Sequence, residues 1–213
     1  MTTYDVNVYQ RFRVTPEEVA HFTENDIGFY GVDVSRISQF LKIQLTAISK
    51  HGPYCSSNLT GIIQDLENVE GHPPPRRSDA FTEEPLKGLW KSHFFDPLFM
   101  VPNVFNHWEI HKKKSKKFDR LVQKVQQEES LHPSKVGWQG RLAHALVVDG
   151  LNERSQKSKG LTGEWVIYAK HQGQNYYLCV SKHTTPNSEQ ERQLHVFIST
   201  VLNEEFPHVT VYA

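Results

Sequence analysis

Cysteine is scarce in this chain of 213 residues, where Cys55 and Cys179 are the two examples. Two cysteines cannot build the disulfide framework of a small secreted domain. No run approaches the roughly 18 apolar residues that a membrane-spanning helix needs. The first residues carry charges from Asp5 onward and lack the apolar core of a signal peptide. We therefore expect a cytoplasmic protein with no membrane partner.

The chain also lacks net charge, because 24 basic residues balance 24 acidic ones. No overall field therefore draws it to nucleic acid or to a membrane surface. The sequence contains no P-loop, no dinucleotide-binding glycine fingerprint, no zinc-finger pairing and no helix-turn-helix pattern. What remains is the composition of a globular protein, with 38% hydrophobic and 23% charged residues, which is sufficient for a packed core.

The hydrophobic pattern predicts an α+β fold with a small antiparallel or mixed sheet packed against several helices. Residues 4–14 alternate between apolar and polar side chains, which predicts an N-terminal strand. A hairpin over 163–183 and a C-terminal strand over 209–212 complete the predicted sheet. Apolar stripes at helical spacing predict the helices, over 33–50, 57–69, 118–125, 135–149 and 188–206. Capping boxes formed by Thr15 with Glu18 and by Ser188 with Glu191 predict two helix starts.

One polar stretch interrupts this pattern, from Glu70 to Asp79, and it contains three successive prolines at 73–75. Successive prolines form a stiff, extended spacer. The stretch fits two interpretations, a surface loop within a single domain over 1–213 or a linker over 71–80. In the second case, a strand and helices would occupy 1–70, and the part that carries the sheet would occupy 81–213.

The hairpin, TGEWVIYAKHQGQNYYLCVSKH at residues 162–183, carries reactive side chains at unusual density. A turn at Gly173 and Gln174 predicts pairing in which opposite residue numbers sum to 347. This register separates an apolar face from a polar one. The apolar face holds Trp165, Ile167, Ala169, Leu178 and Val180. On the polar face it sets Glu164 opposite His183, Tyr168 opposite Cys179, and Lys170 opposite Tyr177.

The polar face offers the groups needed for acid–base chemistry on a phosphate. Glu164 and His183 are candidates for a general base and a general acid. Lys170 would stabilise an anionic transition state, and Tyr168 and Tyr177 would stack on a base or donate to a phosphate. The same side chains are also typical of the solvent-facing side of an antiparallel sheet, where they have no catalytic role. Both interpretations of this face stay open.

Outside the hairpin, His93 follows Lys91 and Ser92 in an aromatic setting, and it is a candidate catalytic group or a histidine of the core. Lys112, Lys113 and Lys114 begin a basic run that ends at 117 and that we expect to contact phosphates. His107 and His111 are four residues apart, a spacing that suits two metal ligands on a helix, but no third ligand stands at a diagnostic spacing. Cys179 fits either a nucleophile or an inert thiol. We expect no metal and no cofactor.

Two functions from different classes account for these features. The first is a metal-independent ribonuclease of a toxin or defence type, which uses the polar face of the hairpin and takes RNA as its partner. The second is a non-catalytic binding or accessory protein, whose aromatic-rich segment over 86–108 and tyrosine-bearing hairpin contact a protein or a small molecule. The sequence leaves the oligomeric state open.

Overall fold

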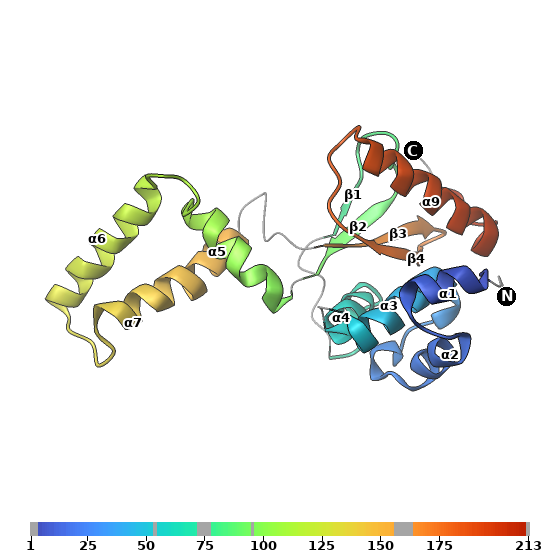
Figure 1. The fold of residues 1–213 in the computed structure, drawn as a ribbon, viewed down its shortest axis with the longest axis horizontal. Coiled ribbons are helices and arrows are strands. Elements are labelled where there is room, and N and C mark those ends of the chain that lie inside the picture. Colours follow the sequence, from blue (N-terminus) through green and yellow to red (C-terminus); the bar gives the residue numbers. More distant parts are fainter. Residues whose placement is uncertain (1–3, 53–54, 72–77, 95, 156–163, 212–213) are drawn as a thin grey trace. The chain divides into compact units, whose positions relative to one another are not determined.

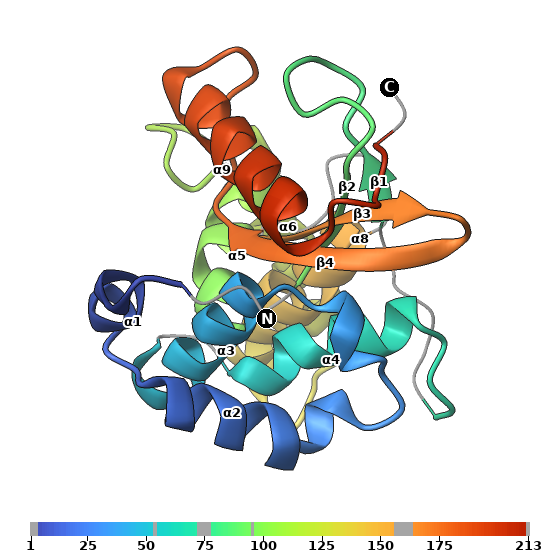
Figure 2. The same ribbon diagram turned by 90° about the vertical axis from the view of Figure 1, so that its right-hand side faces the viewer.

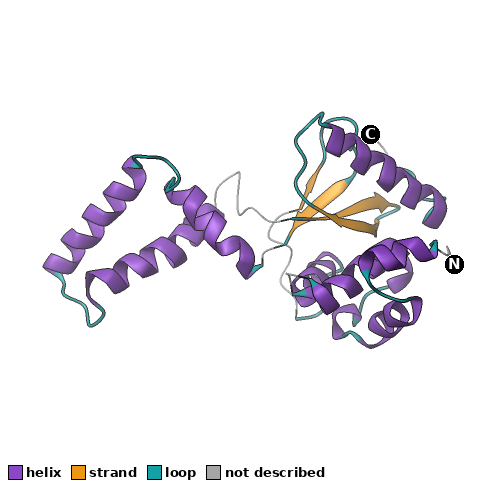
Figure 3. Ribbon diagram, viewed as in Figure 1, coloured by secondary structure: helices purple, strands orange, loops and turns teal. Residues whose placement is uncertain are grey.

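The computed structural model describes residues 4–52, 55–71, 78–94, 96–155 and 164–211. The chain divides into two compact units, the first formed by residues 1–94 with 163–213 and the second by residues 95–162 (Figure 1). All strands of the described residues belong to the first unit, and helices occur in both (Figure 3). The α+β fold with an antiparallel sheet is therefore confirmed.

The sheet has four strands in the order β1-β2-β3-β4, and each strand pairs with its neighbour in an antiparallel sense. The strands are β1 (Ser78–Ala80), β2 (Trp90–His93), β3 (Trp165–His171) and β4 (Gln174–Ser181). The helices of this unit are α1 (Val6–Phe12), α2 (Pro16–Asn25), the short η1 (Ile27–Phe29) and η2 (Val34–Arg36), α3 (Gln39–His51), α4 (Ser56–Leu66) and α9 (Glu189–Glu205). The predicted hairpin is confirmed as β3 and β4.

Helices cover both faces of this sheet (Figure 2). α9 lies over one face, where Trp165 and Ile167 of the sheet join Ile198 and Val201 of the helix in one apolar cluster. α3 and α4 lie under the other face, and α3 contacts β4. The sheet is thus the middle layer of the unit, so the polar face expected on the hairpin does not lie against solvent along its length.

The predicted N-terminal strand is wrong, because residues 6–12 form helix α1. Asp5 caps the helix by accepting a hydrogen bond from the backbone N–H of Asn7. Val6 is 65% exposed, whereas Tyr9 is buried and Phe12 packs beside it. Apolar residues in so short a segment satisfy a period of two and a helical period equally well, and packing against α3 decides for the helix.

The C-terminal strand is also not formed over 209–211, and Tyr212 lies outside the described residues. Val209 and Val211 instead pack against the apolar cluster under α9. The capping signals upstream are more reliable because they act locally: Thr15 and Glu18 form a complete capping box at the start of α2. Ser188 likewise accepts a hydrogen bond from Glu191 at the start of α9.

The register of the hairpin differs from the predicted one. The turn is centred on Gln172 and Gly173, whose φ angles of 49° and 78° are those of a two-residue turn with positive φ at both positions. Ile167 lies opposite Cys179 and Tyr168 opposite Tyr177, with a bulge between these pairs. The bulge and the earlier turn therefore replace the predicted pairs, and Lys170 lies opposite Asn175.

The outer edge of β4 is covered by polar groups of the helical layer. The backbone N–H of Ser38 donates to the carbonyl of Tyr177, and its hydroxyl donates to the carbonyl of Leu178 at 2.7 Å. The amide side chain of Gln44 accepts from the N–H of Val180 at 2.7 Å and donates to the carbonyl of the same residue at 3.0 Å. Backbone groups that an edge strand would leave unpaired are thus satisfied without a fifth strand.

The second unit is helical throughout its described residues. It comprises η3 (Pro97–Phe99), α5 (Met100–Trp108), α6 (Lys116–Leu131), α7 (Gly137–His144), the π-helical turn η4 (Ala145–Asp149) and α8 (Gly150–Ser155). Val104, Trp108, Leu121 and Val125 form its core, and the indole N–H of Trp108 donates to a carbonyl of η4 at 2.9 Å. Across the described parts of both units, no helix has the length and apolar character needed to cross a membrane.

Candidate functional site

The two hairpin tyrosines of the predicted site lie inside the protein. Tyr168 and Tyr177 both have 0% exposure, and their ring centroids are 5.8 Å apart. The hydroxyl of Tyr168 forms a hydrogen bond with that of Ser78, and the hydroxyl of Tyr177 donates to Glu67 at 2.6 Å. Contact with a substrate would require the surrounding side chains to move.

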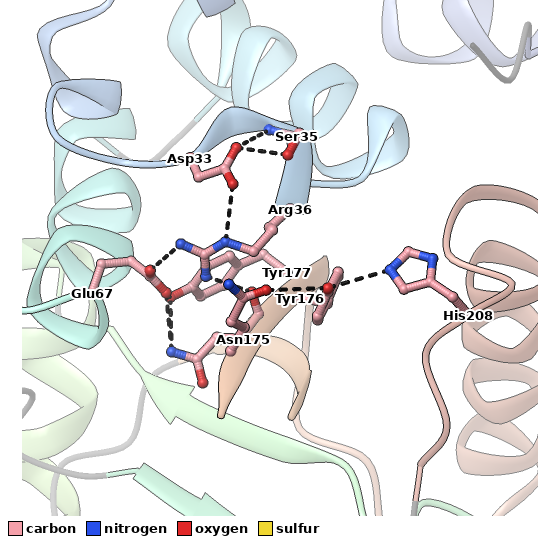
Figure 4. A network of polar contacts seen from close by, with 9 residues as sticks. Asp33, Ser35, Arg36, Glu67, Asn175, Tyr176, Tyr177 and His208 are labelled. Atoms are coloured by element: carbon pink, nitrogen blue, oxygen red, sulfur yellow. Dashed lines mark hydrogen bonds and ion pairs between the residues drawn. The ribbon is translucent and has the colours of Figure 1, made fainter. Parts of the chain in front are cut away.

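Tyr177 belongs to a polar network that joins β4 to the helical layer (Figure 4). The carboxylate of Glu67 accepts from Arg36, from Tyr177 and, at 3.0 Å, from Asn175. Arg36 also donates to the carbonyl of Asn175 at 3.1 Å and to Asp33 at 3.4 Å. Every charged group in the network therefore has a partner of opposite sign, which is the arrangement of a structural clamp.

The environment of this network shifts two pKa values in opposite directions. Burial opposes ionisation of Glu67, but the hydrogen bonds from Arg36, Tyr177 and Asn175 outweigh it and hold the pKa of the carboxyl below its ordinary value. Burial, together with the neighbouring carboxylate, raises the pKa of Tyr177. Glu67 is thus held ionised and Tyr177 neutral, which makes the tyrosine a donor rather than a proton carrier.

A cluster of imidazole and indole rings lies at the end of the sheet where β2 ends and β3 begins. Antiparallel pairing sets His93 opposite Trp165. The ring of His183, from the segment after β4, stacks on that of Trp165 with centroids 4.3 Å apart. The centroids of His93 and His183 are 5.0 Å apart. The structure therefore brings together two histidines that the sequence nominated separately, one half-buried and one exposed.

A lysine completes this cluster. Lys91 lies two residues before His93 in β2, so its side chain is on the same face of the sheet. Its ammonium lies 4.4 Å from the ring centroid of Trp165 and 4.2 Å from that of Phe81. Aromatic faces attract a cation electrostatically. The ammonium of Lys91 is therefore held against Trp165, the ring that both histidines contact. We call Lys91, His93, Trp165 and His183 the histidine cluster.

One buried donor of the histidine cluster lacks a hydrogen-bond acceptor among the described residues. The indole N–H of Trp165 is buried and makes no hydrogen bond to any described residue, and the same holds for the hydroxyl of Thr184 beside His183. Buried polar groups in native proteins are generally paired, and an unpaired one costs about 1–3 kcal/mol.

Glu164 lies on the other side of this end of the sheet. Trp165 pairs with Ser181, and extending that register by one residue sets Glu164 beside Lys182 instead of His183. Both Glu164 and Lys182 line a cavity of about 430 Å³ in the first unit. The backbone carbonyl of Glu164 also accepts from the N–H of Phe94 at 3.3 Å, which ties the start of β3 to the end of β2.

The remaining predicted site residues lie elsewhere. The ammonium of Lys170 is 3.5 Å from the ring centroid of Trp90, at the opposite end of the hairpin from His183. Lys112, Lys113 and Lys114 are exposed between α5 and α6 of the second unit, and Lys112 forms an ion pair with Glu109 at 2.8 Å.

The histidine pair considered for a metal is separated by the end of α5. His107 is buried and its Nε2 lies 3.1 Å from Glu153 and 2.7 Å from the ammonium of Lys117, whereas His111 is exposed beyond the helix. No three His, Cys, Asp or Glu side chains of the described residues are grouped to hold a metal ion. Burial raises the pKa of the Cys179 thiol to about 12, which identifies it as an inert core thiol.

The aromatic segment over 86–108 is mostly internal. Among its described aromatic side chains, Phe94 and Trp108 are buried, Trp90 and Phe99 are half-buried, and Phe105 is 46% exposed. With Tyr168 and Tyr177 also buried, few of the described aromatic rings of the hairpin and of this segment are exposed to a partner.

Sequence reasoning missed the residues that give the sites their charge. Arg36 and Glu67 lie in segments whose pattern predicts only a helix, and Lys91 has no role in the site predicted from the sequence. Trp165 was assigned to the core alone. A usable signal was present in β3 and β4, where residues 166–169 and 176–180 are continuous apolar runs. Such runs are typical of strands buried on both faces.

Comparison with known proteins adds no relative: no family model, no curated protein and no solved structure matches this chain.

Proposed function

We propose that the histidine cluster cleaves RNA without a metal, as part of a cytoplasmic enzyme. The observation that carries the proposal is the pair of imidazoles, His93 and His183, with ring centroids 5.0 Å apart beside a held lysine. General acid–base catalysis needs one group that accepts a proton and one that donates it, both with pKa values near the operating pH. Histidine is the side chain whose ordinary pKa meets that condition.

The reaction uses the 2′-hydroxyl of the substrate as its nucleophile. One imidazole, in its neutral form, accepts the proton of the 2′-hydroxyl as that oxygen bonds to the adjacent phosphorus. The other imidazole, in its protonated form, donates to the 5′-oxygen as the bond between phosphorus and that oxygen breaks. The products are a 2′,3′-cyclic phosphate and a 5′-hydroxyl, and no metal, oxidant or second substrate is consumed.

The positions of the two rings suit these roles if the phosphate lies across their edges. The ring planes are tilted by 57°, so the two rings do not stack face to face. His183 is exposed and reaches solvent, whereas His93 is anchored at the end of β2. Lys91 supplies a positive charge for the phosphorane-like transition state, in place of the more distant Lys170.

The test is cleavage of a single-stranded RNA in EDTA by the purified protein. We expect fragments that end in a 2′,3′-cyclic phosphate, and no cleavage of the 2′-deoxy version of the same strand. His183→Ala and His93→Gln should each reduce the rate by about 10²- to 10⁴-fold, the usual contribution of a general acid or base. Each substitution should also remove one limb of a bell-shaped pH–rate profile.

The chain offers a matched control in a second histidine pair. His171 and His208 have ring centroids 6.2 Å apart at the other end of the hairpin. We expect His171→Ala and His208→Ala to keep the full rate. Intact RNA with the wild-type protein, or equal losses in the two pairs, would remove the proposal. Thermal unfolding of each variant shows whether a lost rate reflects lost structure.

A further inference from the structure

The cavity beside Glu164 has the charge and the position of a site for a phosphate group. Its walls come from the end of α1, the second half of α3, the residue before β3, and the end of β4 with the residue that follows it. A volume of about 430 Å³ lies within the range of about 300–1,000 Å³ typical of ligand sites. The cavity lies within the first unit, so its shape does not depend on the second.

Positive charge dominates this cavity. Arg11, Arg13 and Lys182 line it together with a single carboxylate, that of Glu164. Within the ranges that the structure describes, none of the ion pairs involves Arg11, Arg13 or Lys182. A chain with no net charge thus concentrates three cations around one hollow, which raises the local concentration of anions.

The shape of the cavity is fixed by backbone contacts. Arg13 ends α1 in a left-handed conformation with φ of 54°. Its carbonyl lies 3.1 Å from Nε2 of His51, at the end of α3. Gln44 holds Val180 on the opposite wall. His51 and Gln44 in the walls of the cavity thus bond to backbone groups. They carry no negative charge that would neutralise the three cations.

The cavity and the histidine cluster are adjacent along two segments of the chain. Glu164 precedes Trp165, and Lys182 precedes His183. The first residue of each pair lines the cavity, and the second belongs to the histidine cluster. An extended polyanion that passes around this end of the sheet would contact both.

We infer that the cavity binds a backbone phosphate of single-stranded RNA next to the linkage that the histidine cluster cleaves. The inference rests on the proposed function for the identity of the polyanion. Arg11, Arg13 and Lys182 neutralise the phosphate charge, and they fix the register of the strand so that the following linkage meets His93 and His183. Binding at this site does not require cleavage, so the two ideas are tested separately.

The experiment measures binding of a 2′-deoxy oligonucleotide, which lacks the nucleophile, by fluorescence anisotropy across a series of salt concentrations. For single strands, the slope of log K against log salt changes by about 0.7 for each phosphate contact. Arg11→Gln combined with Lys182→Gln should therefore reduce the slope by about 1.4. If the two curves meet at 1 M salt, binding weakens by about 70-fold at 50 mM and about 10-fold at 200 mM.

The matched control removes the same charge elsewhere in the first unit. Lys87→Gln combined with Arg192→Gln alters two exposed residues outside the cavity, and we expect it to bind like the wild type. Equal binding by the cavity variant and the wild type, equal losses in both double variants, or no binding by the wild type would each overturn the inference. Selective loss in the cavity variant supports it, even where RNA is not cleaved. If cleavage depends on His93 and His183 but the cavity variant binds like the wild type, the phosphate site in the cavity is refuted and the proposed function stands.

Discussion

Tyr177→Phe removes the hydroxyl that donates to Glu67 in the clamp between β4 and the helical layer, and with it a longer contact of 3.4 Å from the side-chain amide of Asn175. The ring keeps its place because it is fully buried and the substitution deletes only the hydroxyl. That hydroxyl donates to the ionised carboxylate of Glu67 at 2.6 Å. A hydrogen bond to a charged group contributes about 1.5–3 kcal/mol to stability. We expect the free energy of unfolding of the first unit to fall by that amount.

The neighbouring tyrosine is the control. The hydroxyl of Tyr176 has long contacts, at 3.4 Å to Gln174 and 3.3 Å to His208. Tyr176→Phe should therefore cost about 0.5 kcal/mol, the low end for a neutral hydrogen bond. The measurement is hydrogen exchange of the slowest amides of β3 and β4, which reports opening of this unit without assuming that the whole chain unfolds in one step. Equal costs for the two substitutions would refute the reasoning.

Acidity provides a second check on the same clamp. The pKa of Glu67 is lower in the folded protein than in the unfolded chain, so the unfolded state binds more protons as the pH falls. The carboxylate therefore adds stability above its unfolded pKa, and that stability is lost as the pH falls through the folded value. In Glu67→Gln this acid dependence should be weaker, and the cost of Tyr177→Phe should fall to about 0.5–1.5 kcal/mol, as for a neutral pair.

Two further predictions concern glycines and thiols. A β-carbon on Gly28 would lie 2.1 Å from the hydroxyl oxygen of Thr60, whereas one on Gly61, inside α4, would meet no atom within 4 Å. Gly28→Ala should thus destabilise the protein by about 1–3 kcal/mol, and Gly61→Ala should stabilise it by about 0.5–1 kcal/mol. Thermal unfolding measures both changes, and a change of the same sign in both variants would contradict the prediction. Cys55 is exposed and Cys179 is buried with a pKa of about 12, so a thiol reagent should modify one thiol in the native protein and two after denaturation. Rapid native modification of both would place Cys179 outside the core.

Features encoded by a few adjacent residues could be predicted from the sequence. Thr15 with Glu18, and Ser188 with Glu191, mark helix starts because their hydrogen bonds span three residues. The turn of the hairpin was displaced by one residue, because Gly173 fits either central position and the bulge near Tyr168 depends on the layers around the sheet. The N-terminal helix could not be distinguished from a strand over so few residues.

The candidate site was less predictable because its parts come from distant segments. The sequence identifies His93 and His183 as separate candidates, yet their contact depends on β2, a strand of four residues within the aromatic-rich segment for which no strand is predicted. Arg11, Arg13 and Lys182 meet only because α1 packs against α3 and α3 packs against β4. A local sequence pattern can identify reactive residue types. It cannot show that cations from distant segments of the chain gather around one cavity, because the tertiary fold brings them together.

The side chain of Gln44 has a consequence for the behaviour of this protein in concentrated solution. Gln44 bonds both the N–H and the carbonyl of Val180. These are the backbone groups to which a strand from another copy of the chain could otherwise bond. An exposed sheet margin recruits further molecules and begins the growth of fibrils. With Ser38, Gln44 therefore keeps backbone groups of the β4 edge paired within the molecule, and we expect Gln44→Ala to increase association between copies of the chain, as light scattering at matched concentration would show.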